Sequence, residues 1–203
     1  MKRLLALFVL IVASASAHAE APVILVFGDS ISAGYGLPLE QGWVELLKTR
    51  LNSQGYGYQV VNASVSGETT AGGLARLPRA LELHHPSIVI LELGGNDGLR
   101  GLPIGQMRAN LTQMVNLSAT AGAKVLLLGM RMPPNYGPEY TTQFAMVFSD
   151  LAAEKKTALV PFLLTNIALS PALLQADDIH PNAAGQPILL DNVWPAIQPL
   201  LRK

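Results

Sequence analysis

The sequence contains no cysteine and few charged residues. The absence of cysteine excludes disulfide bonds, thiolate zinc sites, iron–sulfur clusters and a cysteine nucleophile. Only 14% of the residues are charged, with 14 basic side chains against 14 acidic ones. A chain with this balance has no general electrostatic attraction to phosphate, so we expect no broad nucleic-acid binding.

The sequence also lacks a hydrophobic run long enough to span a membrane. The apolar run 4–12 is far shorter than the roughly 20 residues that a bilayer requires, and we expect no stable membrane insertion. This run follows the basic pair Lys2-Arg3 and precedes Ala17-His18-Ala19, a small-x-small cleavage pattern. Together these features predict a secretory signal peptide over residues 1–19.

The predicted cleavage after Ala19 leaves 184 of the 203 residues and removes two basic side chains, so the mature net charge is −2. This length fits one domain, residues 20–203, and it buries enough surface to fold without disulfides. We expect the mature protein in a periplasm or outside the cell. The sequence predicts no oligomeric state.

Half of the residues are hydrophobic, and short apolar runs alternate with helical patterns. Continuous apolar runs next to glycine are typical of strands buried on both faces. The predicted strands are 23–27, 58–61, 88–93, 125–128 and 158–162. Apolar residues at helical spacing predict helices around 43–51, 74–83, 104–118 and 140–151, with a C-terminal helix from residue 181. Because Pro78 lies inside the second of these helices, we expect a kink or a late start there.

This alternation predicts parallel strands joined by right-handed crossovers. The expected fold is a three-layer α/β/α sandwich with a five-stranded, mostly parallel sheet of the flavodoxin-like kind. Ligands bind at the carboxyl ends of the strands in such sheets, which selects loops 28–36, 62–73 and 94–103. All three loops are rich in Gly, Ser, Asn and Asp, and no helix-capping signal is strong enough to explain that composition. We therefore expect the chemistry in these loops.

Histidine is scarce enough to allow reasoning by elimination. His84 and His85 lie at the end of a predicted helix, where histidine commonly serves as a favourable charge. His180 lies three residues after Asp177, a spacing that can bring both side chains to one side of a turn. A carboxylate there can accept the Nδ1 proton and leave Nε2 as a base. A capping role for His180 stays open, and a metal site is the weaker interpretation because no further histidine lies nearby.

A base of this kind requires a nucleophile or a water molecule. Ser30 follows the first predicted strand in Gly28-Asp29-Ser30-Ile31-Ser32. The segment differs from the G-x-S-x-G elbow of α/β-hydrolases because Ser32 replaces the second glycine. The alternative is that Asp29 or Ser30 only caps a short helix.

Four short motifs together resemble the SGNH (GDSL-type) hydrolase family. They are Gly28-Asp29-Ser30, Gly67 within Ser64-Val65-Ser66-Gly67-Glu68-Thr69, Gly94-Gly95-Asn96-Asp97, and Asp177-x-x-His180. Their order matches the four family blocks across almost the whole mature chain, and Ile31 is an apolar exchange for the family's leucine. The stretches 72–78, 92–101 and 134–137 resemble the bacterial thioesterase I/arylesterase/lysophospholipase L1 branch.

The resemblance implies a secreted serine esterase that needs no metal or organic cofactor. It implies Ser30 as the nucleophile, His180 as the general base and then acid, and Asp177 as the residue that orients His180. The Ser30 and Gly67 backbone N–H groups and the Asn96 side-chain amide would form the oxyanion hole. Ordinary turn formation is the alternative explanation for Gly67 and Asn96.

The substrate is predicted only by class: a small-molecule ester or thioester. Loops 98–103 and 130–136 are apolar and are expected to flank the site. They favour aryl or medium-chain acyl esters, and lysophospholipids stay open. The candidate substrate-binding residues are Leu99, Leu102, Met132, Tyr136 and Ile179. The alternative from another class is a non-catalytic, flavodoxin-like protein that binds a small ligand in the same loops.

Overall fold

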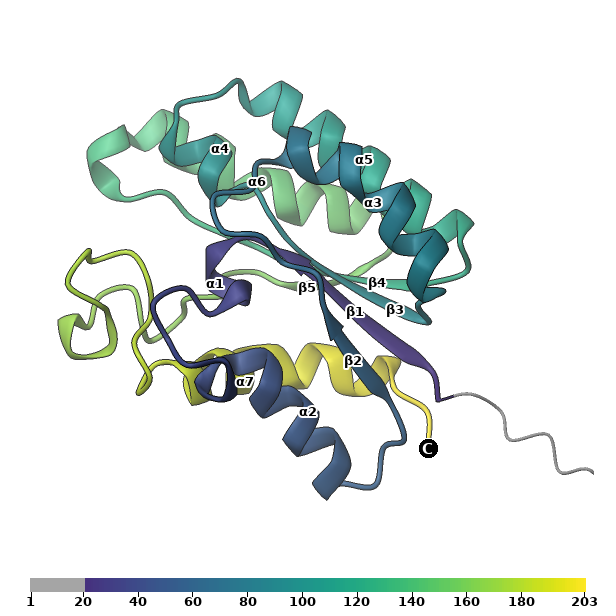
Figure 1. Ribbon diagram of the computed structural model, residues 1–203. Helices are drawn as coiled ribbons and strands as arrows, with labels where there is room; N and C mark the ends of the chain where they lie inside the picture. Colours follow the sequence, from purple (N-terminus) through teal and green to yellow (C-terminus); the bar gives the residue numbers. More distant parts are fainter. Residues whose placement is uncertain (1–20) are drawn as a thin grey trace, which may run out of the picture.

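A five-stranded sheet forms the centre of the molecule (Figure 1). The computed structural model describes residues 21–203, so the predicted signal peptide 1–19 lies outside the described residues. The strands are β1 (Val23–Gly28), β2 (Gln59–Asn62), β3 (Ile88–Glu92), β4 (Lys124–Leu128) and β5 (Ala158–Val160). Each strand differs from its predicted range by one or two residues at an end, and such shifts are normal at strand ends.

The strand order is β2-β1-β3-β4-β5, and each of the four pairings is parallel. This is the flavodoxin-like order, in which the chain first builds outward from β1 on one side and then continues on the other side. The two directions of winding meet between β1 and β3. That point is the expected ligand site of a doubly wound sheet.

Helices cover both faces of the sheet (Figure 1). The helices are α1 (Ser30–Ala33), α2 (Trp43–Ser53), α3 (Thr70–His84), α4 (Gly95–Leu99), α5 (Ile104–Thr120), α6 (Pro138–Lys155) and α7 (Gln186–Ile197). Helices α3, α5 and α6 lie on one face, and α2 and α7 pack together on the other. The predicted three-layer α/β/α sandwich is confirmed. Within residues 21–203, no helix combines the length and apolarity needed to cross a bilayer.

The central strands are buried on both faces. Every residue of β3 is buried, and so are residues 24–28 of β1. Large side chains from the helices fill the space on both sides of these strands, including Trp43 on α2 and Phe144 and Phe148 on α6. Continuous apolar sequences are typical of strands covered by helices on both faces. The same property made these strands readable from the sequence.

Helix α3 begins earlier than the sequence suggests and passes through its proline. The helix runs from Thr70 to His84 with Pro78 inside it, so it begins four residues before the predicted residue 74, and a late start at Pro78 is wrong. The side chain of Thr69 caps the helix by accepting a hydrogen bond from the Gly72 N–H, 3.3 Å. Buried Leu77 then packs the helix into the core. Capping and packing together outweigh the unfavourable proline and glycines.

The C-terminal helix begins later than predicted, at Gln186 rather than residue 181. Asn182 organises the intervening turn: its Oδ1 accepts hydrogen bonds from the N–H groups of Ala184 and Gly185. Its amide nitrogen donates to the Ala172 carbonyl at 2.9 Å. These bonds hold residues 181–185 as a turn, because an asparagine side chain competes with helix formation for backbone groups.

Gly98 leaves no space for a side chain on α4. A Cβ at this position would lie 2.4 Å from Met132 Sδ and 2.7 Å from the ring of Phe144, which is fully buried. We expect Gly98→Ala to destabilise the fold by about 1–3 kcal/mol, the usual cost of overpacking a core. Urea denaturation measures the loss, and Gly105→Ala, where a Cβ meets open space, is the control. Equal stability of the two variants would contradict this packing.

Candidate active site

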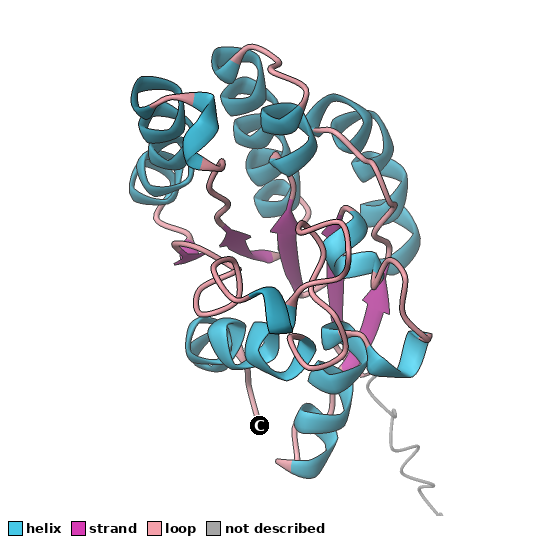
Figure 2. Cartoon of the chain, turned by 90° about the vertical axis from the view of Figure 1, so that its left-hand side faces the viewer, coloured by secondary structure: helices cyan, strands magenta, loops and turns pink. Residues whose placement is uncertain are grey.

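The loops that follow β1, β2 and β3 meet at one edge of the sheet. Ser30 follows β1, Gly67 follows β2, and Asn96 follows β3. Parallel neighbouring strands end at the same edge, which brings these three loops together. Figure 2 faces the side on which α1 lies in Figure 1, with the connecting loops drawn in pink. Two of the three predicted loops contain short helices: α1, which the capping alternative for Asp29 allowed, and α4, which the sequence did not indicate.

Ser30, His180 and Asp177 form a continuous hydrogen-bonded chain. Ser30 Oγ lies 2.8 Å from His180 Nε2, although the two residues are 150 positions apart. His180 Nδ1 lies 2.6 Å from Asp177 Oδ2. A carboxylate can only accept, so Nδ1 carries the proton and Nε2 is free to accept the serine hydroxyl. The arrangement is that of a serine nucleophile, a base and an orienting acid.

Asp177 is held in its ionised form by its own turn. Its Oδ1 accepts the N–H groups of Ile179 and His180, each at 3.0 Å. Burial favours the neutral acid, but the hydrogen bonds from His180 and Ile179 outweigh it and lower the pKa of Asp177 to about 2. One carboxylate therefore shapes the turn and orients the imidazole. Asp178 lies at φ 57° and is exposed, with no side-chain hydrogen bond among the described residues.

Ser30 is the first residue of α1, and Asp29 caps that helix. The Ile31 N–H donates to Asp29 Oδ1 at 3.0 Å. The capping alternative and the site therefore coexist, because Asp29 provides the cap while Ser30 faces His180. The Asn96 amide nitrogen donates one hydrogen to Asp29 Oδ2, 3.1 Å. Its second N–H stays available, since an amide carries two.

Gly67 lies in a turn that requires glycine. Its φ of 79° is in the left-handed region, which side chains disfavour. Arg100, at the end of α4, donates to the Gly67 carbonyl at 2.9 Å, and the Val65 N–H donates to the Gly28 carbonyl at 3.0 Å. These bonds join the Gly67 turn to the loops after β1 and β3. Within residues 21–203, neither the Ser30 N–H nor the Gly67 N–H has a hydrogen-bond acceptor.

Asp97 connects the Gly67 turn to the helix that carries Asn96. It is buried, its Oδ2 accepts the Thr70 N–H at 2.8 Å, and Thr70 Oγ1 donates to its other oxygen. Asn110 on α5 donates to the same threonine oxygen at 3.0 Å. Asp97 was not among the site residues predicted from the sequence, although it follows Asn96 directly. The available signal was the only acid in the Gly-rich loop 94–103, directly after Asn96.

Tyr35 and Gln175 surround His180 and were also missed from the sequence. The rings of Tyr35 and His180 lie 4.7 Å apart, centroid to centroid, with a tilt of 42°. Gln175 donates its amide to the Tyr35 carbonyl at 2.8 Å, and its N–H donates to the His180 carbonyl at 2.8 Å. These hydrogen bonds connect the loop before α7 to the loop after α1. No sequence pattern indicated this contact, which joins segments about 140 residues apart.

The five candidate substrate-binding residues lie in different environments. Leu99, Leu102 and Ile179 are exposed, between 37% and 42%. Tyr136 is half-buried, and its hydroxyl donates to the Leu99 carbonyl at 3.0 Å. Met132 is 7% exposed, and its sulfur lies against Gly98 in the packing between α4 and α6. Three of the five therefore offer exposed apolar surface on the loops, whereas Met132 is buried and packs against Gly98 of α4.

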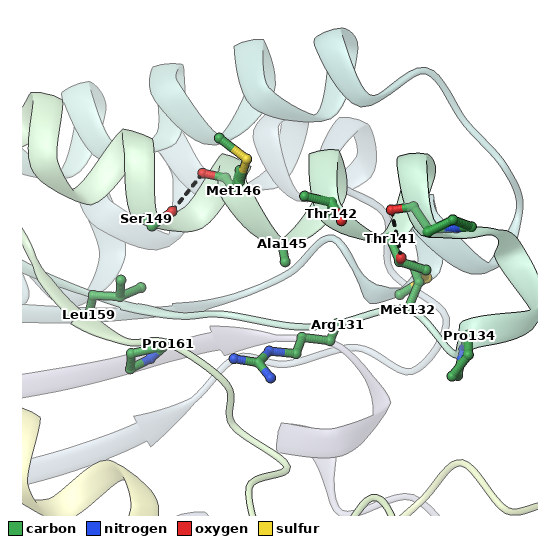
Figure 3. Close-up of a pocket in the computed structure, with 11 residues that line it drawn as sticks. Arg131, Met132, Pro134, Thr141, Thr142, Ala145, Met146, Ser149, Leu159 and Pro161 are labelled. Carbon is green, nitrogen blue, oxygen red and sulfur yellow. Dashed lines mark hydrogen bonds between the residues drawn. The ribbon is translucent and has the colours of Figure 1, made fainter.

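A cavity of about 690 Å³ lies between α6 and the edge strand β5, and the candidate substrate-binding residue Met132 lines it (Figure 3). Its lining is largely apolar and includes Met146, Leu159 and Pro161, with Arg131 at its floor. Ser30 and His180 do not line it. Hydrogen-bond geometry, not cavity size, marks the site of chemistry here. Among residues 21–203, no group of three or more His, Asp or Glu side chains is placed to hold a metal ion.

Comparisons with known proteins identify the family. The esterase TesA of Pseudomonas aeruginosa is 55% identical over 184 residues, covering 91% of this chain and 92% of that protein. The Escherichia coli thioesterase 1/protease 1/lysophospholipase L1 is 42% identical over 183 residues, covering 90% and 86%. A crystal structure of TesA, 55% identical, superimposes with a TM-score of 0.87 over 88% of this chain and 99% of that one.

The family model of the GDSL-like lipase/acylhydrolases matches residues 26–188. That range contains all four motifs on which the resemblance rested, from Gly28 to His180. The chain belongs to the GDSL-like lipase/acylhydrolase family.

Proposed function

We propose that this protein is a serine esterase that hydrolyses carboxylic esters and thioesters through an acyl-enzyme on Ser30. The observation that carries the proposal is the hydrogen-bonded chain from Ser30 Oγ through His180 to Asp177, at 2.8 and 2.6 Å. A serine hydroxyl is a weak nucleophile until a neighbouring base takes its proton. Nε2 of His180 is positioned for that transfer.

In the first half-reaction, Ser30 Oγ attacks the carbonyl carbon while its proton moves to Nε2. The resulting imidazolium is stabilised by Asp177, whose lowered pKa of about 2 keeps it ionised. The carbonyl oxygen becomes an oxyanion, which the Ser30 and Gly67 N–H groups and the free Asn96 N–H stabilise. The tetrahedral intermediate collapses, and the alcohol or thiol departs with the proton from Nε2.

In the second half-reaction, water replaces the alcohol. His180 accepts a proton from the water as its oxygen attacks the acyl carbon, and the same three donors hold the new oxyanion. Collapse releases the carboxylic acid and returns the proton to Ser30 Oγ. Every proton step uses His180, so the cycle requires no metal or organic cofactor.

The preferred substrates are aryl or medium-chain acyl esters, with lysophospholipids as a further class. Exposed Leu99, Leu102 and Ile179 offer apolar surface for an acyl or aryl group. The names of the relatives, an esterase and a thioesterase/lysophospholipase, support esters, thioesters and lysophospholipids as substrate classes. We further propose that residues 1–19 direct export and that residues 20–203 act as one domain in the periplasm or outside the cell.

A fluorophosphonate probe tests the function directly. The purified protein should be labelled once, at Ser30, and should hydrolyse a chain-length series of p-nitrophenyl esters with saturation kinetics. Tryptic mapping identifies the labelled residue. A flavodoxin-like binding protein without catalysis would bind the esters but neither react with the probe nor release p-nitrophenol, and that result would reject the proposal.

Asn96 provides a test of the oxyanion hole. Asn96→Ala removes one donor aimed at the transition state, so kcat should fall by roughly 10²–10³. KM should change little, because the donor contributes mainly when negative charge develops on the substrate. Steady-state kinetics on p-nitrophenyl butyrate gives both constants. An unchanged kcat with a raised KM would instead assign Asn96 to ground-state binding.

A further inference from the structure

Two carboxyl groups lie side by side beneath the nucleophile. Glu92 ends β3 and pairs in register with Gly28 of β1. Its Oε2 accepts the Asp29 N–H at 3.2 Å and the Ser32 hydroxyl at 2.7 Å. A Cβ on Gly28 would lie 2.6 Å from this oxygen, so the carboxyl occupies the space that glycine leaves free. Glu92 is 0% exposed and Asp29 is 2% exposed.

The surroundings of Asp29 and Glu92 contain little that could neutralise two carboxylate charges. No lysine or arginine of the described residues forms an ion pair with either carboxyl. The titratable groups that face the pair are His180, which acts on Asp29, and the two carboxyls themselves. Within residues 21–203, Glu92 Oε1 has no hydrogen-bond partner. Two adjacent buried carboxylates are costly, so one of them is expected to bind a proton.

The hydrogen bonds decide which carboxyl keeps the charge. Asp29 accepts the Ile31 N–H on one oxygen and the Asn96 amide on the other, so both of its oxygens face donors. Glu92 receives both of its donors on Oε2 alone. Burial raises the pKa of Asp29 to about 6, against the effect of its hydrogen bonds. Burial and the Asp29 charge raise the pKa of Glu92 well above its usual range.

We propose that the Asp29–Glu92 pair carries a single negative charge, located on Asp29, and that this charge positions the Asn96 amide in the oxyanion hole. Glu92 is then a neutral carboxylic acid that fixes the backbone of the Asp29–Ser32 turn. Both are positioning residues, because neither is placed to touch the substrate. The inference for Asn96 rests on the proposed function, whereas the charge state of the pair does not.

The ionised state of Asp29 matters because it accepts hydrogen bonds only. A carboxylate at Oδ2 selects the amide orientation in which Asn96 presents Nδ2, and leaves the second N–H for the oxyanion. In the reversed orientation, Asn96 Oδ1 would face the Asp29 carboxylate. Both groups are acceptors, so no hydrogen bond could form between them. A single buried charge thus fixes the direction of the donor.

Asp29→Asn tests the positioning role. The new side chain still accepts the Ile31 N–H, but its own amide nitrogen then faces Asn96 Nδ2, so the Asn96 amide must turn over. We expect kcat to fall by about 10–100-fold. This loss should not exceed the loss of kcat in Asn96→Ala, which removes the donor itself. KM should stay within about twofold, since the donor acts on the transition state. A urea midpoint no lower than the parent's separates this result from unfolding.

The double variant distinguishes positioning from a general structural effect. In an Asn96→Ala background, Asp29→Asn should cost less than about threefold in kcat, because residues that act through one another are not additive. An equal loss in both backgrounds, or an unchanged kcat in the single variant, would overturn the positioning role.

Glu92→Gln tests the charge state without using activity. A neutral Glu92 in the folded chain keeps a proton that the unfolded chain loses above its ordinary pKa of about 4.3. The folded parent therefore loses stability as the pH rises, and glutamine, which does not titrate, avoids the loss. The urea midpoint of Glu92→Gln should exceed that of the parent by a margin that grows from pH 5 to pH 8.

Glu40→Gln is the matched control, because Glu40 is exposed and forms no ion pair among residues 21–203. The difference in urea midpoint between Glu40→Gln and the parent should stay constant from pH 5 to pH 8. A flat margin for Glu92→Gln as well would overturn the neutral acid. This arm gives an answer even if the parent proves to have no esterase activity, so failure of the proposed function and failure of the pair are separable.

Discussion

Ser30→Ala is expected to lower kcat for ester hydrolysis by on the order of 10⁴–10⁶-fold, the scale of losing the nucleophile of a serine triad. The hydroxyl is the only oxygen within reach of His180 Nε2 among the described residues, at 2.8 Å. Without it no acyl-enzyme forms, and the remaining donors stabilise only direct attack by water. The fold should survive, because one hydrogen bond at a half-buried position contributes about 1 kcal/mol.

The measurement combines single-turnover kinetics with fluorophosphonate labelling and a urea melt. Ser66→Ala is the matched control: Ser66 is exposed and lies beside Gly67. It should keep kcat within about twofold of the parent, as surface substitutions usually do. Activity of Ser30→Ala within tenfold of the parent, or labelling that persists, would contradict the assignment of the nucleophile.

Asp177→Asn is expected to lower kcat by up to about 10⁴-fold, the loss found when the acid of such a triad becomes an amide. The structure supplies the reason. The N–H groups of Ile179 and His180 both require an acceptor at Oδ1. The asparagine oxygen must therefore stay there, and its NH₂ group faces His180 Nδ1. Nδ1 then accepts, Nε2 carries the proton, and the imidazole can no longer take the proton of Ser30.

A matched variant separates the orienting role of Asp177 from the simple loss of one negative charge. Because the pKa of Asp177 is lowered to about 2, it is ionised in the parent at every pH from 4 to 9. Both variants are compared with the parent by single turnover at pH 8, where Asp177 of the parent is fully ionised. Asp178→Asn is the control, since asparagine tolerates the left-handed φ of 57°, and its loss should be about twofold or less. A larger loss for Asp178→Asn than for Asp177→Asn would show that the wrong acid was chosen.

Much of the fold could be predicted because its strands are buried on both faces. β1 and residues 88–91 of β3 read as continuous apolar runs, and the chain order of strands and helices then leaves few topologies. The short helices α1 and α4 could not be predicted in the same way. Four and five residues are too few to form a stable helix alone, so these helices depend on caps and tertiary contacts.

The same division applies to the site. Ser30, Asp177 and His180 could be selected because histidine is scarce and the Asp-x-x-His spacing is local. Glu92 was read only as part of a strand, although an acid inside a buried apolar run is a signal worth following. Its contact with Asp29 crosses 63 positions and depends on the register of β1 against β3. A pattern read along the chain does not contain that register.

The separation of 150 residues between Ser30 and His180 has a consequence for the timing of catalysis. The proposed nucleophile belongs to the first strand–helix unit of the sheet, whereas the proposed base lies on the loop that precedes the last helix, α7. A partly synthesised chain that lacks the C-terminal segment therefore holds Ser30 without its proton acceptor and cannot be acylated by an ester. Hydrolytic activity begins only when the C-terminal segment docks, so unfinished chains are harmless to any ester they meet.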